Sequence, residues 1–249
     1  MGIHQPSDAH WVEAAFISIH RIATRISSFL VGDWILDSGA FSTILKHGGY
    51  PEAPEVYAAQ IKRWSRNGNL LAAVTQDYMC EAHMLAITGL TIEDHQRLTI
   101  DRFDAIAACD LGGVYLMPVL QGYDPQDYVR HLQLYGDRIA QGAWVGVGSV
   151  CKRNGDPAAI EAVLLAILGV RPDLLIHGFG IKTTALQSEV VRAALHTADS
   201  MAWSLAARKE GRDGNSIREA VAFAKRIEHL PTRPQPSLFA ALVPQRPVS

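Results

Sequence analysis

The sequence predicts an α/β fold, built as a single (β/α)8 barrel of the TIM type. Short apolar runs with β character alternate with helical segments along most of the chain. This alternation implies parallel strands joined by right-handed crossovers. Seven such runs, with a poorly defined eighth, suit a closed barrel better than an open sheet. An open doubly wound sheet would usually carry a glycine-rich turn after its first strand, and this sequence has none there.

The expected strands are apolar runs that end in small or polar residues, at 14–20, 34–41, 70–78, 114–121, 143–149, 174–180 and 197–203. The expected helices carry apolar residues at helical spacing, at 54–65, 92–108, 125–135, 157–168, 184–195 and 216–228. Thr91 and Asp94 have the spacing of a capping box at the start of the second of these helices. Proline is frequent from residue 230 onward, so we expect a barrel domain over 1–229 and an extended or loose tail over 230–249.

The composition excludes several classes of protein. The chain has 249 residues, of which 48% are hydrophobic, and its Cys count is 3, so it is neither disordered nor a disulfide scaffold. Lysine and arginine number 23 against 25 aspartate and glutamate, which gives a net charge of −2. This balance excludes a protein that coats nucleic acid with positive charge, and a polynucleotide would have to be held by a local basic patch. The sequence has no recognisable signal peptide and no apolar run that would span a membrane, so we expect a cytoplasmic protein with reduced cysteines.

Polar side chains stand at the ends of successive expected strands. These ends read DSGAF at 37–41, TQDY at 75–78, PVLQG at 118–122, GVGSV at 146–150, HGFGIK at 177–182 and DSMAW at 199–203. In a barrel such ends converge on one face, where active sites are built. Three aspartates and one amide are therefore expected to share one mouth, namely Asp37, Asp77, Asp199 and Gln121. A single aspartate at a strand end is also a common helix N-cap or turn former, but three together favour a site.

In this order and at this spacing, the motifs resemble the tRNA-guanine transglycosylase superfamily. The short chain and the segment at 199–203 are most similar to DpdA-type DNA-guanine transglycosylases, which place 7-deazaguanine bases in DNA. The resemblance covers roughly residues 30–215. It implies an enzyme, a pentosyltransferase that exchanges guanine for a 7-deazaguanine such as preQ0 through a covalent glycosyl-aspartate intermediate.

The resemblance implies two catalytic residues. Asp37 lies in the segment that is similar to the general acid/base motif of the superfamily. The tRNA enzymes have a pair of aspartates three residues apart near 199–203, and the second one is the nucleophile. Here Asp199 is followed by Ala202 in that second place, so Asp199 is the nucleophile candidate as the only carboxylate in the segment. A helix-cap role for Asp199 stays open.

The resemblance also implies a binding site for the flat base. The carboxylate and the amide at the ends of two strands match the groups that hydrogen-bond the purine edge, because the first accepts and the second both accepts and donates. A glycine–serine turn matches the one that meets the exocyclic oxygen or nitrile of the base. An aromatic residue and a histidine fall where the family stacks side chains on the ring faces. The residues are Phe41, Asp77, Gln121, Gly148, Ser149 and His177.

The chain departs from the tRNA enzymes in the region after the nucleophile. Those enzymes carry a zinc site of cysteines and a histidine there, whereas no cysteine occurs after residue 151 here. We therefore expect the zinc-binding subdomain to be absent, and we expect neither a metal nor a cofactor. Cys80 and His83 are too few for a zinc site. Without this subdomain and the archaeal RNA-binding extension, the resemblance favours DNA and a free 7-deazaguanine as partners over a folded tRNA.

Basic residues on the loops after three of the strands are the candidates for contacts to DNA phosphates. They are Lys152, Arg153, Lys182, Arg208, Lys209 and Arg212, and solvated loop charges are the other reading of each group. A duplex would have to flip the target guanine out of the stack. The resemblance leaves room for a helper protein that opens the DNA and for a homodimer. Two other functions stay open: base exchange or hydrolysis on a free nucleoside or nucleotide, and a non-catalytic transglycosylase-like subunit.

Overall fold

The strands form two four-stranded parallel sheets in the computed structural model, which describes residues 1–153 and 155–228 without the side chains of residues 152 and 228. The first sheet contains, in order, β1 (Ala14–Ser18), β2 (Asp33–Asp37), β3 (Asn69–Val74) and β4 (Tyr115–Met117). The second contains β5 (Val119–Leu120), β6 (Trp144–Val147), β7 (Leu175–Gly178) and β8 (Leu195–Ala198). The predicted α/β class and the parallel strands are confirmed. The predicted tail, 230–249, lies outside the described residues.

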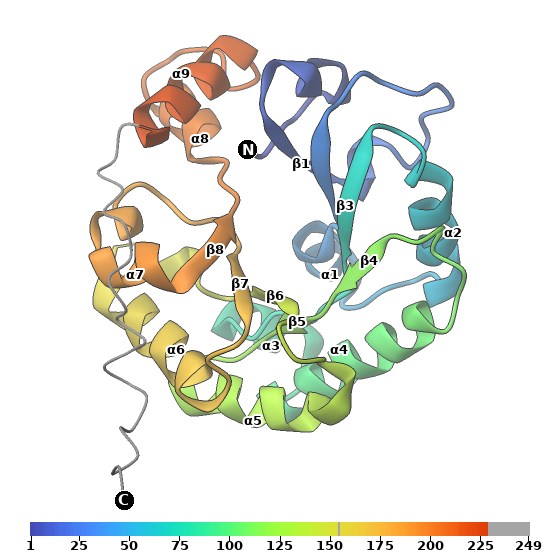
Figure 1. Ribbon diagram of the computed structural model, residues 1–249, viewed down its shortest axis with the longest axis vertical. Helices are drawn as coiled ribbons and strands as arrows, with labels where there is room; N and C mark the ends of the chain where they lie inside the picture. The colour runs from blue at the N-terminus through green and yellow to red at the C-terminus, as the bar shows by residue number, and fades with distance from the viewer. Residues whose placement is uncertain (154, 229–249) are drawn as a thin grey trace, which may run out of the picture.

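Helices surround the strands on the outside (Figure 1). They are α1 (Ala40–His47), α2 (Pro54–Trp64), α3 (Ala82–Thr88), α4 (Ile92–Ala107), α5 (Pro125–Tyr135), α6 (Pro157–Val170), α7 (Glu189–Ala194), α8 (Ala202–Lys209) and α9 (Ile217–Glu228). The 3-10 turns are η1 (Pro6–Trp11), η2 (Ile19–Arg21), η3 (Gly136–Arg138), η4 (Cys151–Arg153) and η5 (Ala185–Gln187). The predicted capping box is confirmed at α4, where the Thr91 hydroxyl accepts from the Asp94 backbone N–H at 3.1 Å. Such a cap contributes about 1 kcal/mol to stability.

One predicted strand, 114–121, is divided into β4 and β5 at Pro118. Proline has no backbone N–H, so it cannot donate to a neighbouring strand. Its carbonyl still accepts from the Gly146 N–H at 2.8 Å, which joins the end of the first sheet to β6. At the other edge, Gly2 donates to the Ser200 carbonyl at 3.1 Å, and Phe16 accepts from Ile3 at 3.0 Å. Backbone hydrogen bonds therefore connect the two sheets on both sides.

The two sheets share an apolar interior. Ile35, Val74, Met117 and Val119 form a buried cluster, with Phe179 packed against it. These residues come from both sheets, so the sheets face one another across a common core. That core is closed by side-chain packing at its centre, and the strand ends above it are free to present polar groups.

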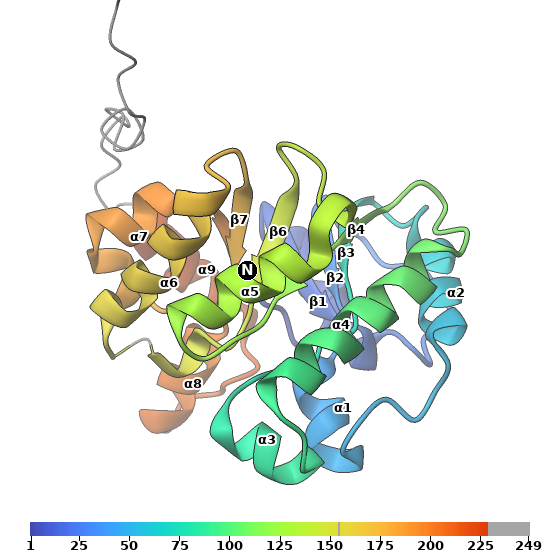
Figure 2. The same ribbon diagram turned by 90° about the horizontal axis from the view of Figure 1, so that it is seen from below.

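The predicted strands end earlier than expected, and after two of them a helix starts where the pattern still looked apolar. The strand predicted at 34–41 ends at Asp37, and α1 begins after Gly39, whose φ of 71° lies in the left-handed region. The strand predicted at 197–203 ends at Ala198, and α8 begins at Ala202. The helix predicted at 184–195 is shorter and divided between η5 and α7. Figure 2 shows α1, α3 and α8 at the same end of the strands.

In the part of the chain that the structure describes, we find no helix with the length and apolar character needed to cross a bilayer.

Candidate active site

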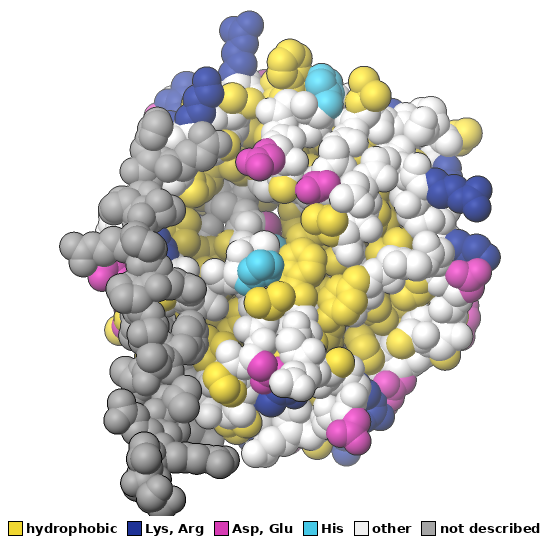
Figure 3. All heavy atoms as spheres, in the orientation of Figure 1, with side chains coloured by type: hydrophobic (Ala, Val, Ile, Leu, Met, Phe, Trp, Pro, Cys, Tyr) yellow, Lys and Arg dark blue, Asp and Glu magenta, His cyan; other side chains and the backbone are white. Residues whose placement is uncertain are grey.

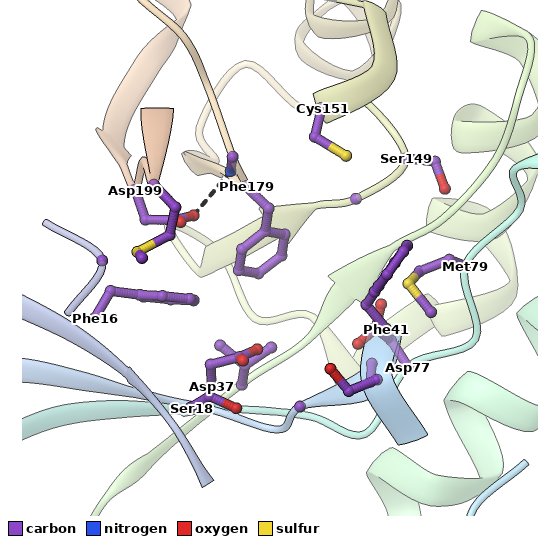
Figure 4. A pocket seen from close by; sticks show the side chains of 18 of the residues that line it. Phe16, Ser18, Asp37, Phe41, Asp77, Met79, Ser149, Cys151, Phe179 and Asp199 are labelled. Carbon is purple, nitrogen blue, oxygen red and sulfur yellow. Dashed lines mark hydrogen bonds between the residues drawn. The ribbon is translucent and has the colours of Figure 1, made fainter. Parts of the chain in front are cut away.

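A cavity of about 490 Å³ opens at the carboxyl ends of the strands. Its wall comes from both sheets and from the loops after them (Figure 4). The predicted site residues that line it are Asp37, Phe41, Asp77, Gln121, Gly148, Ser149 and Asp199. The topology thus brings together side chains that lie as much as 160 residues apart in the sequence, roughly the size of a small domain.

Asp37 ends β2 and reaches the cavity beside β1. Its carboxylate accepts hydrogen bonds from the Gly39 backbone and the Ser18 hydroxyl. Burial raises the pKa of Asp37 to about 6, helped by the negative charge of Asp199 and opposed by the two hydrogen bonds. Near neutral pH a fraction of Asp37 therefore carries a proton, as a general acid requires.

Asp199 follows β8 and lies on the opposite side of the cavity from Phe41 (Figure 4). Its Oδ1 accepts from the Gly180 N–H at 2.9 Å, which fixes the carboxylate against the loop after β7. The side chain is buried, yet it lines the cavity. Ala202, which stands where the tRNA enzymes have a second aspartate, begins α8 and is not part of the cavity lining.

His177 is the one predicted base-binding residue that the structure keeps out of the cavity lining. It is 1% exposed and lies in the interior, with its ring stacked on Phe16 at 5.5 Å. Its Nδ1 is 2.9 Å from the Thr197 hydroxyl, and its Nε2 is 3.5 Å from Asp199 Oδ1 without the alignment of a hydrogen bond. His177 therefore lies behind the wall and next to Asp199, whereas Phe179 on the same side of the strand reaches the cavity.

A hydrogen-bonded network forms the other end of the cavity. Gln121 Nε2 donates to Asp77 Oδ2, and Ser149 Oγ is 2.7 Å from Gln121 Oε1 and 3.0 Å from Glu81 Oε2. The same hydroxyl accepts from the Cys80 N–H at 3.0 Å. Because a hydroxyl has one proton, it donates to either the amide or the glutamate at any moment. The network presents a carboxylate, an amide and a hydroxyl side by side, the groups needed to read a purine edge.

The backbone of Gln121 is held by hydrogen bonds on the side away from the cavity. Its backbone N–H donates to His131 Nδ1 at 2.9 Å, and its carbonyl accepts from Gln96 Nε2 at 2.7 Å. Burial lowers the pKa of His131 to about 3, so the ring is neutral and can accept. On the cavity side, a Cβ at Gly148 would lie 2.1 Å from Gln121 Nε2, so only glycine fits there. The strand end is therefore rigid and closely packed around this amide.

Asp77 is a buried carboxylate of the cavity wall. Burial raises its pKa to about 7, with smaller contributions from Asp37 and Glu81, while the hydrogen bond from Gln121 opposes the rise. A ligand that offers N–H donors to Asp77 would favour the ionised form. Near neutral pH Asp77 can therefore meet a ligand edge either as a carboxylate that accepts or as a carboxyl that donates.

Apolar side chains form two opposed walls. Figure 4 shows Phe41 and Met79 on one side, with Phe16 and Phe179 on the other. Phe41 is on helix α1 and is 42% exposed, so it lies at the opening rather than inside. Apolar side chains on opposite sides of the cavity suit an aromatic ring between them.

The predicted phosphate-binding residues differ in the side chains and backbone groups that they contact. Arg212 forms ion pairs with Glu210 and Glu219 at its exposed position. Arg153 stacks 4.6 Å above the Tyr123 ring and donates to the Tyr123 carbonyl. The remaining positions are Lys182, Lys209 and Arg208, and the side chain of Lys152 lies outside the described part. None of the five whose side chains are described lines the cavity, whereas Arg21, which the sequence did not single out, does.

A metal site is not built by the described side chains, since no group of three or more histidine, cysteine or acidic residues has the required arrangement. Cys80 is buried beside Glu81, and both effects raise the pKa of its thiol, so it stays protonated. The two sequence neighbours Cys80 and His83 do not gain a third ligand.

Residues 1–229 match the family model DpdA, DeoxyPurine in DNA protein A. The chain belongs to the DpdA family. Members of this family are DNA-modifying, transglycosylase-like proteins, so DNA is a partner of this chain and the resemblance seen in the sequence is confirmed. The comparison with curated proteins gives no match.

Sequence reasoning missed several residues that line the cavity of this DpdA-family chain. They are Phe16, Met79, Glu81, Phe179 and Met201. Phe179 lies inside a motif that the sequence singled out, two residues after His177. Glu81 follows Asp77 at the spacing of one helical turn. It lies in a loop, however, where spacing does not predict which way a side chain points.

Proposed function

We propose that this chain exchanges guanine in DNA for a 7-deazaguanine base such as preQ0, through a covalent glycosyl-aspartate intermediate. The observation that carries the proposal is the shared cavity: Asp37 and Asp199 line the same 490 Å³ space as Asp77 and Gln121. Membership of the DpdA family supports DNA as the substrate. A pocket with reactive carboxylates at one end and a hydrogen-bonding edge at the other suits a nucleoside whose base enters first.

In the first displacement, a carboxylate oxygen of Asp199 attacks C1′ of the target deoxyguanosine. The bond between C1′ and N9 breaks, and its electron pair leaves with the guanine. Asp37, whose pKa is raised to about 6, supplies the proton that neutralises the departing base. The products of this step are guanine, the Asp37 carboxylate and a sugar ester of Asp199.

In the second displacement, the incoming 7-deazaguanine loses its N9 proton to the Asp37 carboxylate. Its N9 then attacks C1′ and releases Asp199, which restores both carboxyl groups to their starting states. Because water would hydrolyse the ester, the apolar walls of Phe16, Phe41 and Phe179 help the base to exclude it.

Recognition of the base is assigned to the hydrogen-bonded end. Asp77 accepts from the N–H groups of the purine edge, while Gln121 and the turn at Gly148 and Ser149 meet the exocyclic oxygen or the substituent on the five-membered ring. Phe16 and Phe179 replace His177 as the stack on one ring face, and Phe41 with Met79 covers the other. His177 is assigned a position behind Asp199, where its ring limits the rotation of that carboxylate.

We further propose that the two sheets close as one (β/α)8 barrel over residues 1–229, with residues 1–3 completing the ring between β8 and β1. The backbone hydrogen bonds from Gly2 and Ile3 support this closure. The family match over 1–229 supports one domain of that extent. A helper protein, a homodimer and a cytoplasmic location stay predictions from the sequence.

Incorporation of a labelled base tests the proposed function. Purified protein is incubated with double-stranded or single-stranded DNA and radiolabelled guanine or preQ0, and the label in the DNA is counted. We expect label in the DNA and release of an equal amount of guanine. Absence of incorporation into any DNA, with the protein folded and with a strand-opening protein added, would contradict the proposal.

The same assay separates the alternatives. Exchange on free deoxyguanosine that does not change with salt would favour the nucleoside reading, because polynucleotide binding weakens as salt rises. A chain that binds 7-deazaguanine and forms no covalent intermediate would favour the non-catalytic reading.

A further inference from the structure

Three basic side chains meet beside the cavity, and we call Arg21, His4 and Arg208 the basic cluster. Arg21 Nη2 lies 3.4 Å from His4 Nδ1, and Arg208 Nη2 lies 3.4 Å from His4 Nε2. The three come from η2 after β1, from the segment that bridges the sheets, and from α8 after β8. His4 and Arg21 line the cavity that contains Asp37 and Asp199.

The positive charges of the basic cluster are not matched by acidic side chains. In the described residues, neither Arg21 nor Arg208 forms an ion pair, in contrast to Arg212, which pairs with two glutamates. Burial lowers the pKa of His4, and the two guanidinium groups lower it further, so the imidazole is neutral near pH 7. The cluster therefore holds two positive charges separated by a single ring.

The imidazole cannot satisfy both arginines. A neutral histidine has one N–H and one acceptor nitrogen. His4 Nε2 is also 3.0 Å from the Ser204 hydroxyl. If Nδ1 accepts from Arg21, then Nε2 carries the proton and can donate to Ser204 but cannot accept from Arg208. Among the described residues, at least one guanidinium keeps donors without a side-chain acceptor, which favours an anionic ligand with several oxygens.

Both arginines of the basic cluster are exposed, so their guanidinium groups are accessible to a ligand. The stem of Arg208 passes close to Gly214, where a Cβ would lie 2.5 Å from its Nε. Arg21 lines both the candidate active site and a neighbouring cavity of about 720 Å³, so it lies between the two. A strand of nucleic acid that leaves the active site toward the second cavity would pass Arg21.

We propose that the basic cluster binds a phosphodiester group of the DNA strand next to the nucleotide whose base enters the cavity. A phosphodiester supplies two charged acceptor oxygens, which match the donors of two arginines. This inference rests on the proposed function for its substrate, a nucleotide within a chain. It assigns to Arg21 and His4, together with Arg208, the fixing of the sugar C1′ relative to Asp199.

The test is DNA binding by fluorescence anisotropy across a range of salt concentrations. The variants are Arg21→Gln and Arg208→Gln, and the matched control is Arg66→Gln, since Arg66 is exposed in the turn before β3, at the other end of the strands. We expect each cluster variant to lose about tenfold in affinity and to reduce the salt slope by about one. The control keeps both values. Unchanged affinity in the two cluster variants would overturn the proposal.

A second arm changes the DNA. The phosphates on either side of a single guanine are replaced one at a time by neutral methylphosphonates, and binding to wild-type protein is compared with binding to Arg21→Gln. One replacement should weaken wild-type binding about tenfold and have little effect in the variant. Equal losses in both proteins would overturn the proposal. A second contrary result would be that both methylphosphonate DNAs bind normally, while free deoxyguanosine monophosphate competes for binding only when Arg21 is present.

Binding of free 7-deazaguanine keeps the two proposals apart. We expect the base to bind equally to wild type, Arg21→Gln and Arg208→Gln. If no base binds and no exchange occurs, yet DNA binding still depends on the two arginines and on one phosphate, the proposed function fails and the basic cluster is supported.

Discussion

The two ends of the cavity are built on different principles. At the base-binding end, Asp77, Gln121 and Ser149 hydrogen-bond one another, and neighbouring backbone groups complete the network. At the reactive end, Asp37 and Asp199 face each other as like charges, and burial with this repulsion raises the pKa of Asp37 to about 6. In the described residues no lysine or arginine forms an ion pair with either carboxylate, and the His177 ring lies 3.5 Å from Asp199 Oδ1.

This difference separates recognition from chemistry. A network whose members satisfy one another holds a fixed shape and can select one ring edge over another. The two carboxylates of the reactive end come from separate strands and do not hydrogen-bond one another, and the raised pKa of Asp37, like that of Asp77, lets it take up or release a proton near neutral pH. Changes at the reactive end should therefore alter the rate, whereas changes at the base-binding end should alter affinity for the base.

The largest effect is expected at Asp199. Asp199→Asn removes the attacking oxygen while keeping the shape and the hydrogen bond from Gly180, so exchange should fall by about a thousandfold or more. The measurement is the initial rate of labelled-base incorporation. Asp101→Asn, on the exposed side of α4, is the control and should keep the wild-type rate. Full activity in Asp199→Asn would contradict the assignment of the chemical step to the reactive end.

The next largest effect is expected at Gln121. Gln121→Ala leaves Asp77 without its amide donor and Ser149 without one acceptor, so the edge that reads the base is lost. We expect KM for the free base to rise by roughly tenfold to a hundredfold, because buried polar groups left unpaired are costly. The rate at saturating base should change far less. A fall in kcat with unchanged KM would contradict the assignment of this end to recognition.

A smaller effect is expected at Gly148, which has no side chain and acts by leaving room for the Gln121 amide. In Gly148→Ala the new methyl group would displace the Gln121 amide, since the Cβ would lie 2.1 Å from it. KM for the base should rise by about tenfold, because displaced binding groups cost affinity. Gly169→Ala in α6 is the control, as nothing lies near the added methyl. Equal KM values in the two variants would show that the turn is not needed to place the amide.

The smallest effect is on stability and its pH dependence. Asp37 has a pKa of about 6 in the fold against an ordinary value of 3.8, so ionising it opposes folding. The penalty is absent below pH 4, grows between pH 4 and 6 and is complete above pH 6. Asp37→Asn should therefore raise the free energy of unfolding by on the order of 3 kcal/mol at pH 8 and by far less at pH 4. Urea melts at both values check this, and a gain that is equal at pH 4 and pH 8 would contradict the cause.

Much of the site could be predicted because parallel strands point the same way. Asp37 ends β2, and Gln121 and Asp199 directly follow β5 and β8, so the alternation of strands and helices already placed them at one end of the molecule. His177 was misplaced because it precedes the strand end, and Phe179, on the same side of the strand, reaches the cavity instead. The division of the predicted strand 114–121 at Pro118 arises because proline lacks a backbone N–H, which an apolar pattern does not register.

The rest depends on tertiary contacts that no local pattern encodes. Helix α1 begins only because Gly39 adopts a left-handed conformation, and so Phe41 lies on a helix rather than a strand. The basic cluster forms from residues about 200 apart in sequence, roughly a whole domain. The face opposite the cavity, seen in Figure 3, has hydrophobic side chains in the middle and lysine and arginine side chains toward the edge. The count of charges in the sequence does not distinguish these two faces.

Identification of the carboxylate that bonds to the sugar tests the central claim most directly. Labelled DNA containing one target guanine is incubated with the protein without added base, the mixture is denatured, and the protein–DNA adduct is digested and located by mass spectrometry. We predict a sugar ester on the peptide that contains Asp199, absent in Asp199→Asn and retained in Gln121→Ala. An ester on another carboxylate, or full exchange activity without any covalent adduct, would contradict the account.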